Sequence, residues 1–464
     1  MNNLAKKLFI ETLGCPKNFN DSEAIAGIWE KSGGEVTDDL AQAEVIIINT
    51  CGFINDAKTE SIESIFNMVR FKSDSKNIVD REPIIIVSGC LSERYGAELS
   101  EEIPEVDAFL GVNDYEDLPQ IVSAIARKDC QQRVFHSPAP DKFAEFSARK
   151  IADNPYTATL RIAEGCDNRC AYCVIPLIRG GYRSRPMESI IEEAEMLSRA
   201  GTVEIVLIAQ DVTEYGRDIY GKLMLPKLLE KLCQVDGIKW IRLMYCYEDK
   251  ITDELIDVMA REEKICNYID IPLQHISDNV LGAMRRRSTS DSIRKTLNAL
   301  RSAMPDVHIR TTFITGFPGE TEDDYRSLED FTEEFRFERL GVFAYSREEG
   351  TPADEMTGHI EQEIKEERAQ WIMRRQVNIS REVNESKIGK VLEVLVEGID
   401  EDKETACGRE ITYIGRSRYD APEIDCNVIF KDLRGEEVLR PGTLVNVLIE
   451  DAFDYDLVGI IGRK

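Results

Sequence analysis

The sequence predicts a multidomain α/β protein with three parts: an N-terminal parallel α/β domain, a central partial barrel of six βα units and a small C-terminal antiparallel β-barrel. The chain of 464 residues is too long to share a single hydrophobic core. Short apolar runs alternate with amphipathic helical stretches as far as residue 348, and short strands with glycine-rich turns follow residue 389. We place the three domains at 5–128, 152–384 and 387–464.

The N-terminal domain is expected to hold a Rossmann-like sheet. Its strands read KLFIETLGC, AEVIIINTC and EPIIIVSGC, and helix-like stretches separate them. Continuous apolar strands joined by helices are typical of a parallel sheet that is covered on both faces. The first helix is expected to begin at Asp21 or Ser22, which are good N-cap residues, and to stop before Gly33. The stretch 130–155 contains three prolines and is interpreted as a linker.

The central domain repeats one strand–helix unit six times. Its strands read TATLRIAEG, VEIVLIAQD, IKWIRLMYC, NYIDIPLQH, VHIRTTFITGFP and LGVFAYSRE. Six such units predict an incomplete TIM-like barrel of parallel strands, in which sites lie at the carboxyl ends of the strands. A long helix then leads to KVLEVLVEG, ITYIGRSR, NVIF and TLVNVLIED, which predict the C-terminal barrel.

The chain is strongly acidic. It has 86 acidic and 58 basic residues, which give a net charge of −28 at neutral pH. A surface of that sign repels a phosphate backbone and attracts a basic partner. No apolar run is long enough to span a bilayer, and the N-terminus lacks a signal-peptide pattern. We therefore expect a cytoplasmic protein with no membrane partner.

Three cysteines, Cys166, Cys170 and Cys173, lie within eight residues and follow the first strand of the central domain. Thiolates held this closely suit an iron–sulfur cluster. Three of them leave one iron of a 4Fe–4S cube open to another ligand, and an open position is typical of a reactive centre. A zinc knuckle is the alternative, but structural zinc takes four closed ligands, and the chain has no second C-x2-C pair.

Three further cysteines, Cys15, Cys51 and Cys90, each end one of the N-terminal apolar runs. The carboxyl ends of parallel strands share one edge of a sheet, so these thiols are expected to converge on a second three-thiolate site. The alternative is that each is a small buried residue, as cysteines of reduced compartments often are. The spacing alone leaves both interpretations open.

The cysteine loop, at the end of the first strand of a partial barrel, resembles the radical S-adenosylmethionine superfamily. The resemblance implies that S-adenosylmethionine chelates the open iron and is cleaved to a 5′-deoxyadenosyl radical. It also implies that Gly316 and Glu320, in FITGFPGE, contact this cofactor and that Tyr172 lies near its adenine. Each residue has a plainer interpretation, because glycine marks turns and a loop tyrosine often only packs.

The segments TLGCPKN, INTCGFI and VSGCLSERY, the radical cysteines and the terminal barrel together resemble the methylthiotransferases over nearly the whole chain. The family implies that the last domain is a TRAM barrel. It also implies a second 4Fe–4S cluster, on Cys15, Cys51 and Cys90, and two S-adenosylmethionine molecules, one as methyl donor and one as radical source. The stretch DIPLQHISDNVLGAMRRR at 270–287 matches the family, but the sequence does not reveal its role.

The segments IGRSRYDAPEID at 414–425 and DYDLVG at 454–459 resemble the branch of this family that modifies the β-carbon of an aspartate in ribosomal protein uS12. The predicted TRAM domain carries 17 acidic and 11 basic residues, which suits a basic protein better than nucleic acid. The alternatives are a transfer RNA methylthiotransferase acting on a modified adenosine and a non-radical iron–sulfur electron carrier. No motif marks the reductant or the sulfur donor, and we assign no catalytic residue beyond the cluster ligands.

Overall fold

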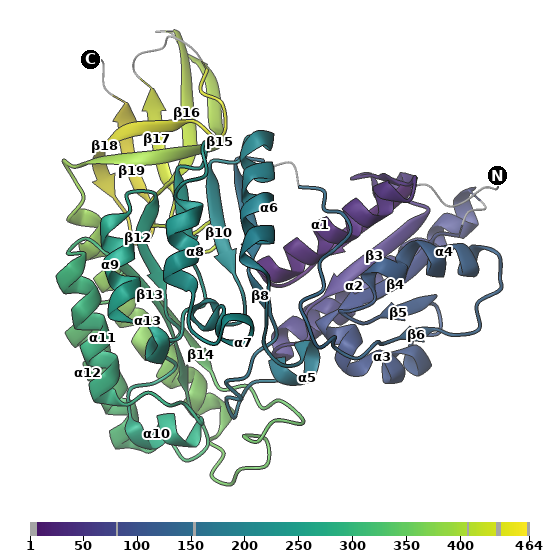
Figure 1. The fold of residues 1–464 in the computed structure, drawn as a ribbon, viewed down its shortest axis with the longest axis horizontal. Coiled ribbons are helices and arrows are strands. Elements are labelled where there is room, and N and C mark those ends of the chain that lie inside the picture. The colour runs from purple at the N-terminus through teal and green to yellow at the C-terminus, as the bar shows by residue number, and fades with distance from the viewer. Residues whose placement is uncertain (1–6, 80–81, 152–154, 406–407, 433–437, 462–464) are drawn as a thin grey trace. The chain divides into compact units, whose positions relative to one another are not determined.

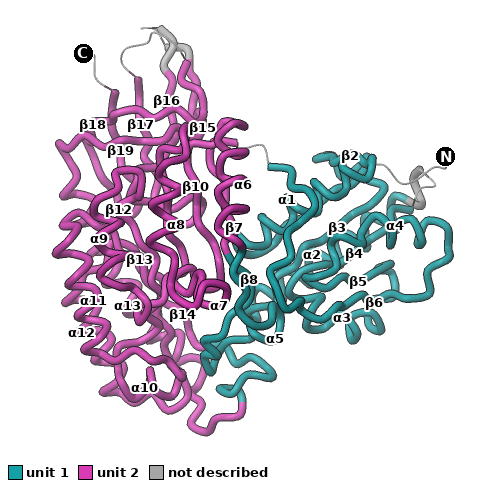
Figure 2. Tube along the Cα trace, in the orientation of Figure 1, with its two compact units in different colours: residues 1–153, 163–185, 346–354 teal, residues 154–162, 186–345, 355–464 magenta. Residues whose placement is uncertain are grey.

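The computed structural model describes residues 7–79, 82–151, 155–405, 408–432 and 438–461 (Figure 1). The chain divides into two compact units (Figure 2). The first joins residues 1–153 to the segments 163–185 and 346–354, and the second holds the rest. The domain boundaries given above stay predictions, and positions 5, 152 and 464 lie outside the described residues.

The first unit contains a six-stranded parallel sheet in the order β2-β1-β3-β4-β5-β6. Its strands are β1 (Lys7–Thr12), β2 (Glu35–Val36), β3 (Val45–Thr50), β4 (Ile84–Gly89), β5 (Ala108–Leu110) and β6 (Val134–Phe135). Its helices include α1 (Pro16–Lys31), α2 (Asn55–Val79), α3 (Cys90–Glu102) and α4 (Leu118–Ala126), with short 3-10 turns at Leu40–Gln42 and Tyr115–Asp117.

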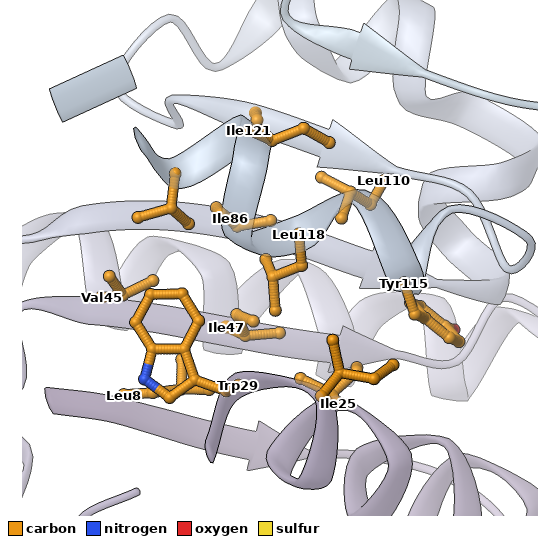
Figure 3. Close-up of a cluster of buried hydrophobic side chains, with 13 residues drawn as sticks. Leu8, Ile25, Trp29, Val45, Ile47, Ile86, Leu110, Tyr115, Leu118 and Ile121 are labelled. Carbon is orange, nitrogen blue, oxygen red and sulfur yellow. The ribbon is translucent and has the colours of Figure 1, made fainter. Parts of the chain in front are cut away.

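Hydrophobic cores lie on both faces of this sheet. On one face, Trp29 of α1 packs with Leu8, Val45 and Ile47 of the strands and with residues of α4 (Figure 3). On the other face, α2 and α3 contribute Ile65 and Leu91 to a second cluster of buried residues. The sheet is therefore covered by helices on both sides, as its apolar strands predict.

Two local predictions in the first unit are wrong. Helix α1 begins at Pro16 with Cys15 as its N-cap, five residues before Asp21. Proline is pre-organised for the first helical position, and Asp21 lies buried inside the helix, where its carboxylate pairs with an arginine. The stretch 130–155 is not only a linker, because β6 within it extends the sheet beside β5.

The second unit contains the predicted six parallel strands, in the order β14-β13-β12-β11-β10-β7. They are β7 (Thr157–Arg161), β10 (Glu204–Ile208), β11 (Trp240–Leu243), β12 (Ile265–Asp270), β13 (His308–Thr315) and β14 (Arg339–Ala344). The helices are α6 (Met187–Ala200), α7 (Arg217–Tyr220), α8 (Leu225–Leu232), α9 (Asp253–Arg261), α10 (Asp278–Ala283), α11 (Ser290–Ala303), α12 (Glu322–Phe335) and α13 (Gln362–Glu385), with 3-10 turns at Val212–Glu214 and Glu248–Lys250. Among the described residues, no helix combines the length and the apolar character needed to cross a membrane.

The C-terminal strands of the second unit close into a barrel in the order β15-β16-β17-β19-β18. The strands are β15 (Val391–Thr405), β16 (Gly408–Ser417), β17 (Val428–Asp432), β18 (Leu444–Ala452) and β19 (Leu457–Ile461). The last strand, β19, was not among the predicted strands. It pairs parallel with β17 and antiparallel with β18, which closes the barrel. The two parallel sheets and this barrel confirm the predicted fold class.

A buried ion cluster joins the barrel to the parallel sheet of the second unit. Arg416 of β16 lies 2.6 Å from Glu204 of β10, and Arg242 of β11 lies 2.8 Å from the same carboxylate. Burial favours the neutral form of Glu204, but Arg416 and Arg242 outweigh it and lower its pKa to about 2. The cluster therefore holds a buried carboxylate in its charged form where the two sheets meet.

We expect Arg416→Met to destabilise the second unit by about 3 kcal/mol, because a buried carboxylate then loses one of its two arginines. Urea denaturation followed by circular dichroism measures the loss. Lys227→Met is the control, because the exposed Lys227–Glu230 pair is expected to contribute less than about 1 kcal/mol. Equal losses in the two variants would contradict a stabilising role for the cluster.

The same cluster predicts how stability depends on pH. The pKa of Glu204 is about 2 in the fold, against an ordinary value of 4.5, so the unfolded chain takes up the proton first as pH falls. The stabilisation is therefore complete above pH 4.5 and is lost as pH falls towards 2. The difference in unfolding free energy between the parent and Glu204→Gln should shrink over that interval. A constant difference would show that Glu204 is not ionised in the fold.

Candidate metal centre

The structure brings Cys15, Cys51 and Cys90 to one edge of the N-terminal sheet. Cys51 directly follows β3, Cys90 is the first residue of α3 after β4, and Cys15 is the N-cap of α1 after β1. Strands β1, β3 and β4 are parallel neighbours, with Thr12 opposite Asn49 and Thr50 opposite Gly89. The three thiols therefore follow equivalent ends of adjacent strands, as the sequence predicts.

Glycines beside these cysteines allow the three loops to approach closely. A Cβ atom at Gly14 would lie 2.8 Å from Cys51 Cβ and 3.2 Å from Cys51 Sγ, and Gly14 has a φ of +95°. A Cβ at Gly52 would lie 2.8 Å from Cα of Leu91, the residue after Cys90. Larger residues at either position would push the thiol-bearing loops apart.

Burial changes the protonation of these thiols. Burial, helped by the neighbouring Cys90 and Cys15, raises the pKa of Cys51 to about 12, while the backbone N–H of Phe53 opposes the shift. Burial also raises the pKa of Cys90. These two thiols are therefore protonated at neutral pH unless a metal displaces the proton. All three cysteines are free of disulfides, so the donor set fits an iron–sulfur cluster.

Cys166, Cys170 and Cys173 lie on a loop of the first unit, between β8 (Ala163–Glu164) and β9 (Arg183–Ser184). The antiparallel pairing of these two short strands closes the loop. The Cys166 N–H donates to Gly180 O at 3.1 Å, and the Cys173 N–H donates to Cys170 O at the same distance. Burial and the neighbouring Cys170 and Cys166 raise the pKa of Cys173, so its thiol keeps its proton at neutral pH unless a metal displaces it.

The two cysteine sets are linked inside the first unit. Helix α5 (Ile175–Arg179), which follows Cys173, lies beside α3 (Figure 1). Its Ile178 and the adjacent Val174 form a buried cluster with Cys90. Arg179, at the end of α5, donates a hydrogen bond from Nη2 to Cys90 Sγ at 3.6 Å. Arg179 is not among the residues that the sequence predicts for the site; its signal in the sequence is a charged residue at the end of the apolar run VIPLIRG.

The three residues that the sequence predicts to contact S-adenosylmethionine belong to both compact units. Tyr172 is half-buried on the cysteine loop of the first unit. Gly316 and Glu320 lie after β13 in the second unit. Gly316 has a φ of +71°, and a Cβ there would lie 1.9 Å from Lys365 Cγ. The backbone of this turn is therefore restricted to glycine by its packing against α13.

Glu320 accepts hydrogen bonds from two neighbours within the second unit, and a histidine lies close by. Its Oε2 accepts from the Gly316 N–H at 2.8 Å, and its Oε1 accepts from Arg368 at 2.6 Å. His275 Nε2 lies 3.4 Å from Oε2, and His275 Nδ1 accepts from the Ser277 N–H at 3.0 Å. His275, in the stretch 270–287 whose role the sequence does not reveal, therefore lies beside the Gly316–Glu320 turn.

Among the residues that the structure describes, no group of three His, Cys, Asp or Glu side chains is arranged to hold a single metal ion. A four-iron cube binds each thiolate through a different iron, so its ligands are spaced more widely than the ligands of one ion.

Three family models match the chain. Residues 7–111 match the Uncharacterized protein family UPF0004, residues 160–332 the Radical SAM superfamily and residues 388–461 the TRAM domain. Curated relatives include the ribosomal protein uS12 methylthiotransferases RimO of Clostridioides difficile and Acetivibrio thermocellus, each 46% identical with 98% of both chains covered. The radical S-adenosylmethionine methyltransferase TsrM of Kitasatospora setae shares the fold, with a TM-score of 0.57 at 13% identity over 86% of this chain and 79% of that one.

We expect Gly14→Ala to lower the iron content of the reconstituted protein, because the new methyl group would displace the Cys51 side chain. Gly33→Ala is a matched control, since Gly33 has the same φ of +95° but no atom within 4 Å of the position that the new methyl group would take. Both changes add the same backbone strain, so only Gly14→Ala should reduce the iron and sulfide counts. Equal counts in the two variants would mean that the close approach of Gly14 to Cys51 does not matter for the metal.

Proposed function

The chain belongs to the ribosomal protein uS12 methylthiotransferase RimO family, and on this premise we propose that it attaches a methylthio group to the β-carbon of an aspartate in uS12. It is a radical S-adenosylmethionine methylthiotransferase with S-adenosylmethionine and 4Fe–4S clusters as cofactors. The observation that carries the proposal is that two sets of three cysteines lie in one compact unit.

We assign one cluster to each cysteine set. Cys166, Cys170 and Cys173 hold the radical cluster, and Cys15, Cys51 and Cys90 hold the cluster that supplies sulfur. When bound, the first cluster supplies the electron that cleaves S-adenosylmethionine to a 5′-deoxyadenosyl radical, and the second presents sulfur for methylation and transfer. Four of the six thiols, those of Cys51, Cys90, Cys166 and Cys170, are buried, which keeps water away from a reactive centre, whereas Cys15 is exposed and Cys173 partly exposed.

The chain's own residues hold these ligands in place. The β8–β9 pairing fixes the ends of the radical-cluster loop, and Gly14 and Gly52 allow the three sulfur-cluster loops to meet. The Gly316–Glu320 turn is proposed to bind S-adenosylmethionine through its backbone. Both Glu320 oxygens already have protein partners, which supports a positioning role for that carboxylate rather than direct contact with the cofactor.

The substrate assignment is supported by charge. A net charge of −28 favours capture of a basic ribosomal protein over an RNA backbone, and the acidic C-terminal barrel is proposed to hold it. A transfer RNA substrate is therefore the weaker candidate. Mass spectrometry of uS12 and of transfer RNA, each incubated with the reconstituted enzyme, distinguishes the two substrates directly.

The cluster assignment predicts different losses for two cysteine variants. Cys170→Ala should abolish both 5′-deoxyadenosine release and methylthio-aspartate formation, because no radical can form. Cys51→Ala should retain 5′-deoxyadenosine release but lose the methylthio product. Each variant should hold about four irons, against about eight in the parent. Cys233→Ala is the control, since Cys233 lies partly buried in the second unit and belongs to neither set.

The assignment is contradicted if Cys51→Ala forms the methylthio product at the parent rate. It is also contradicted if the parent holds only about four irons. Modified transfer RNA together with unmodified uS12 would overturn the substrate and leave the cluster assignment intact.

A further inference from the structure

Arg179 makes a contact that the proposed chemistry does not yet use. Its guanidinium is almost fully buried and reaches three groups of the first unit. Nη2 lies 2.8 Å from Asp21 Oδ2 and donates to Cys90 Sγ at 3.6 Å, and Nη1 lies 3.8 Å from Glu164 Oε2. The same Nη2 therefore faces a carboxylate and a thiol that we assign as a cluster ligand.

The charges around Arg179 show why this contact is more than an ion pair. Asp21 alone would neutralise the guanidinium, and Glu164 has a second cation in Lys17, at 3.2 Å. Arg179 is thus paired with the carboxylate of Asp21, and Lys17 with that of Glu164. One guanidinium nitrogen nevertheless also points to the thiol, while the other faces Glu164, a second position that the single nitrogen of lysine lacks.

Arg179 belongs to the chain segment that carries the other cysteine set, Cys166, Cys170 and Cys173. It lies six residues after Cys173, at the end of α5, while Cys90 starts α3. Val174 and Ile178 pack against Cys90, so both the apolar side and the charged end of this segment touch the same cysteine. One short segment therefore connects the loop of one cluster to a ligand of the other.

We propose that Arg179 is a positioning residue that orients Cys90 as a ligand and raises the reduction potential of the cluster on Cys15, Cys51 and Cys90. The proposal rests on the ligand assignment in the proposed function. A hydrogen bond and a positive charge at a ligand sulfur stabilise the reduced cluster, which carries one more negative charge. Asp21 opposes this effect, because its carboxylate takes part of the same guanidinium charge.

The test is a potentiometric titration followed by electron paramagnetic resonance. It uses the full chain with Cys170→Ala, in which only the cluster on Cys15, Cys51 and Cys90 remains. Arg179→Gln should lower the midpoint potential of that cluster, and Asp21→Asn should raise it. Arg179→Lys, which keeps the charge but not the fork, should fall between the parent and Arg179→Gln. Shifts of opposite sign are a result that simple loss of structure does not produce.

Arg149→Gln is the matched control. Arg149 is a nearly buried arginine that lies 2.6 Å from Glu23, and Glu23 is on α1, the helix that also carries Asp21. Arg149→Gln should leave the potential at the parent value. Equal potentials in the parent and Arg179→Gln would overturn the proposal, and so would downward shifts in both Arg179→Gln and Asp21→Asn. If Arg179→Gln does not fold, the potential of Asp21→Asn decides the question: an upward shift supports the proposal, and a downward or absent shift overturns it.

Failure of the ligand assignment gives a different result. The Cys170→Ala parent would then contain little iron, and no titration could be recorded for any variant. A parent with about four irons and an unchanged potential in Arg179→Gln would instead reject the role of Arg179 alone.

Discussion

The close approach of three strand-to-helix loops at one edge of a parallel sheet is the constraint on which the site depends. Hydrogen bonding fixes the register of β1, β3 and β4, so the three strands end nearly level with one another. The thiols that follow these strands are therefore placed at nearly equivalent positions. The loops can meet only because glycines beside the thiols leave room for a neighbouring side chain or backbone. The backbone thus determines the thiol positions before any metal binds.

A second constraint joins this edge to the other cysteine set. The segment 163–185 belongs to the same compact unit as the N-terminal sheet, although it follows the first strand of the other sheet in the chain. Apolar packing of Val174 and Ile178 against Cys90, and the buried Arg179–Asp21 pair, hold it there. Breaking a buried pair on one side leaves an uncompensated charge, so this attachment is costly to undo. For a methylthiotransferase, such an attachment keeps the two cysteine sets, which we propose as the ligands of the two clusters, in one compact unit.

Much of this arrangement could be predicted from the sequence. Continuous apolar strands with intervening helices predict both parallel sheets, and cysteines at matching strand ends predict the shared edge. Contacts between distant segments could not be predicted, because periodicity describes one element at a time. Asp21 is a typical helix-start residue by local preference, but Pro16 starts the helix earlier and Asp21 instead pairs with Arg179. Strands β6 and β19 are short, and pairing with neighbours distant in sequence stabilises them more than their own apolar pattern does. The division into two units also depends on such long-range packing.

We propose that each cysteine set holds its own four-iron cluster. An anomalous difference map at the iron edge, from crystals grown without oxygen, would locate the iron. We expect two separate iron peaks, one bounded by Cys166, Cys170 and Cys173 and the other by Cys15, Cys51 and Cys90. A single peak at the first set, with the thiols of the second set free of metal, would contradict it.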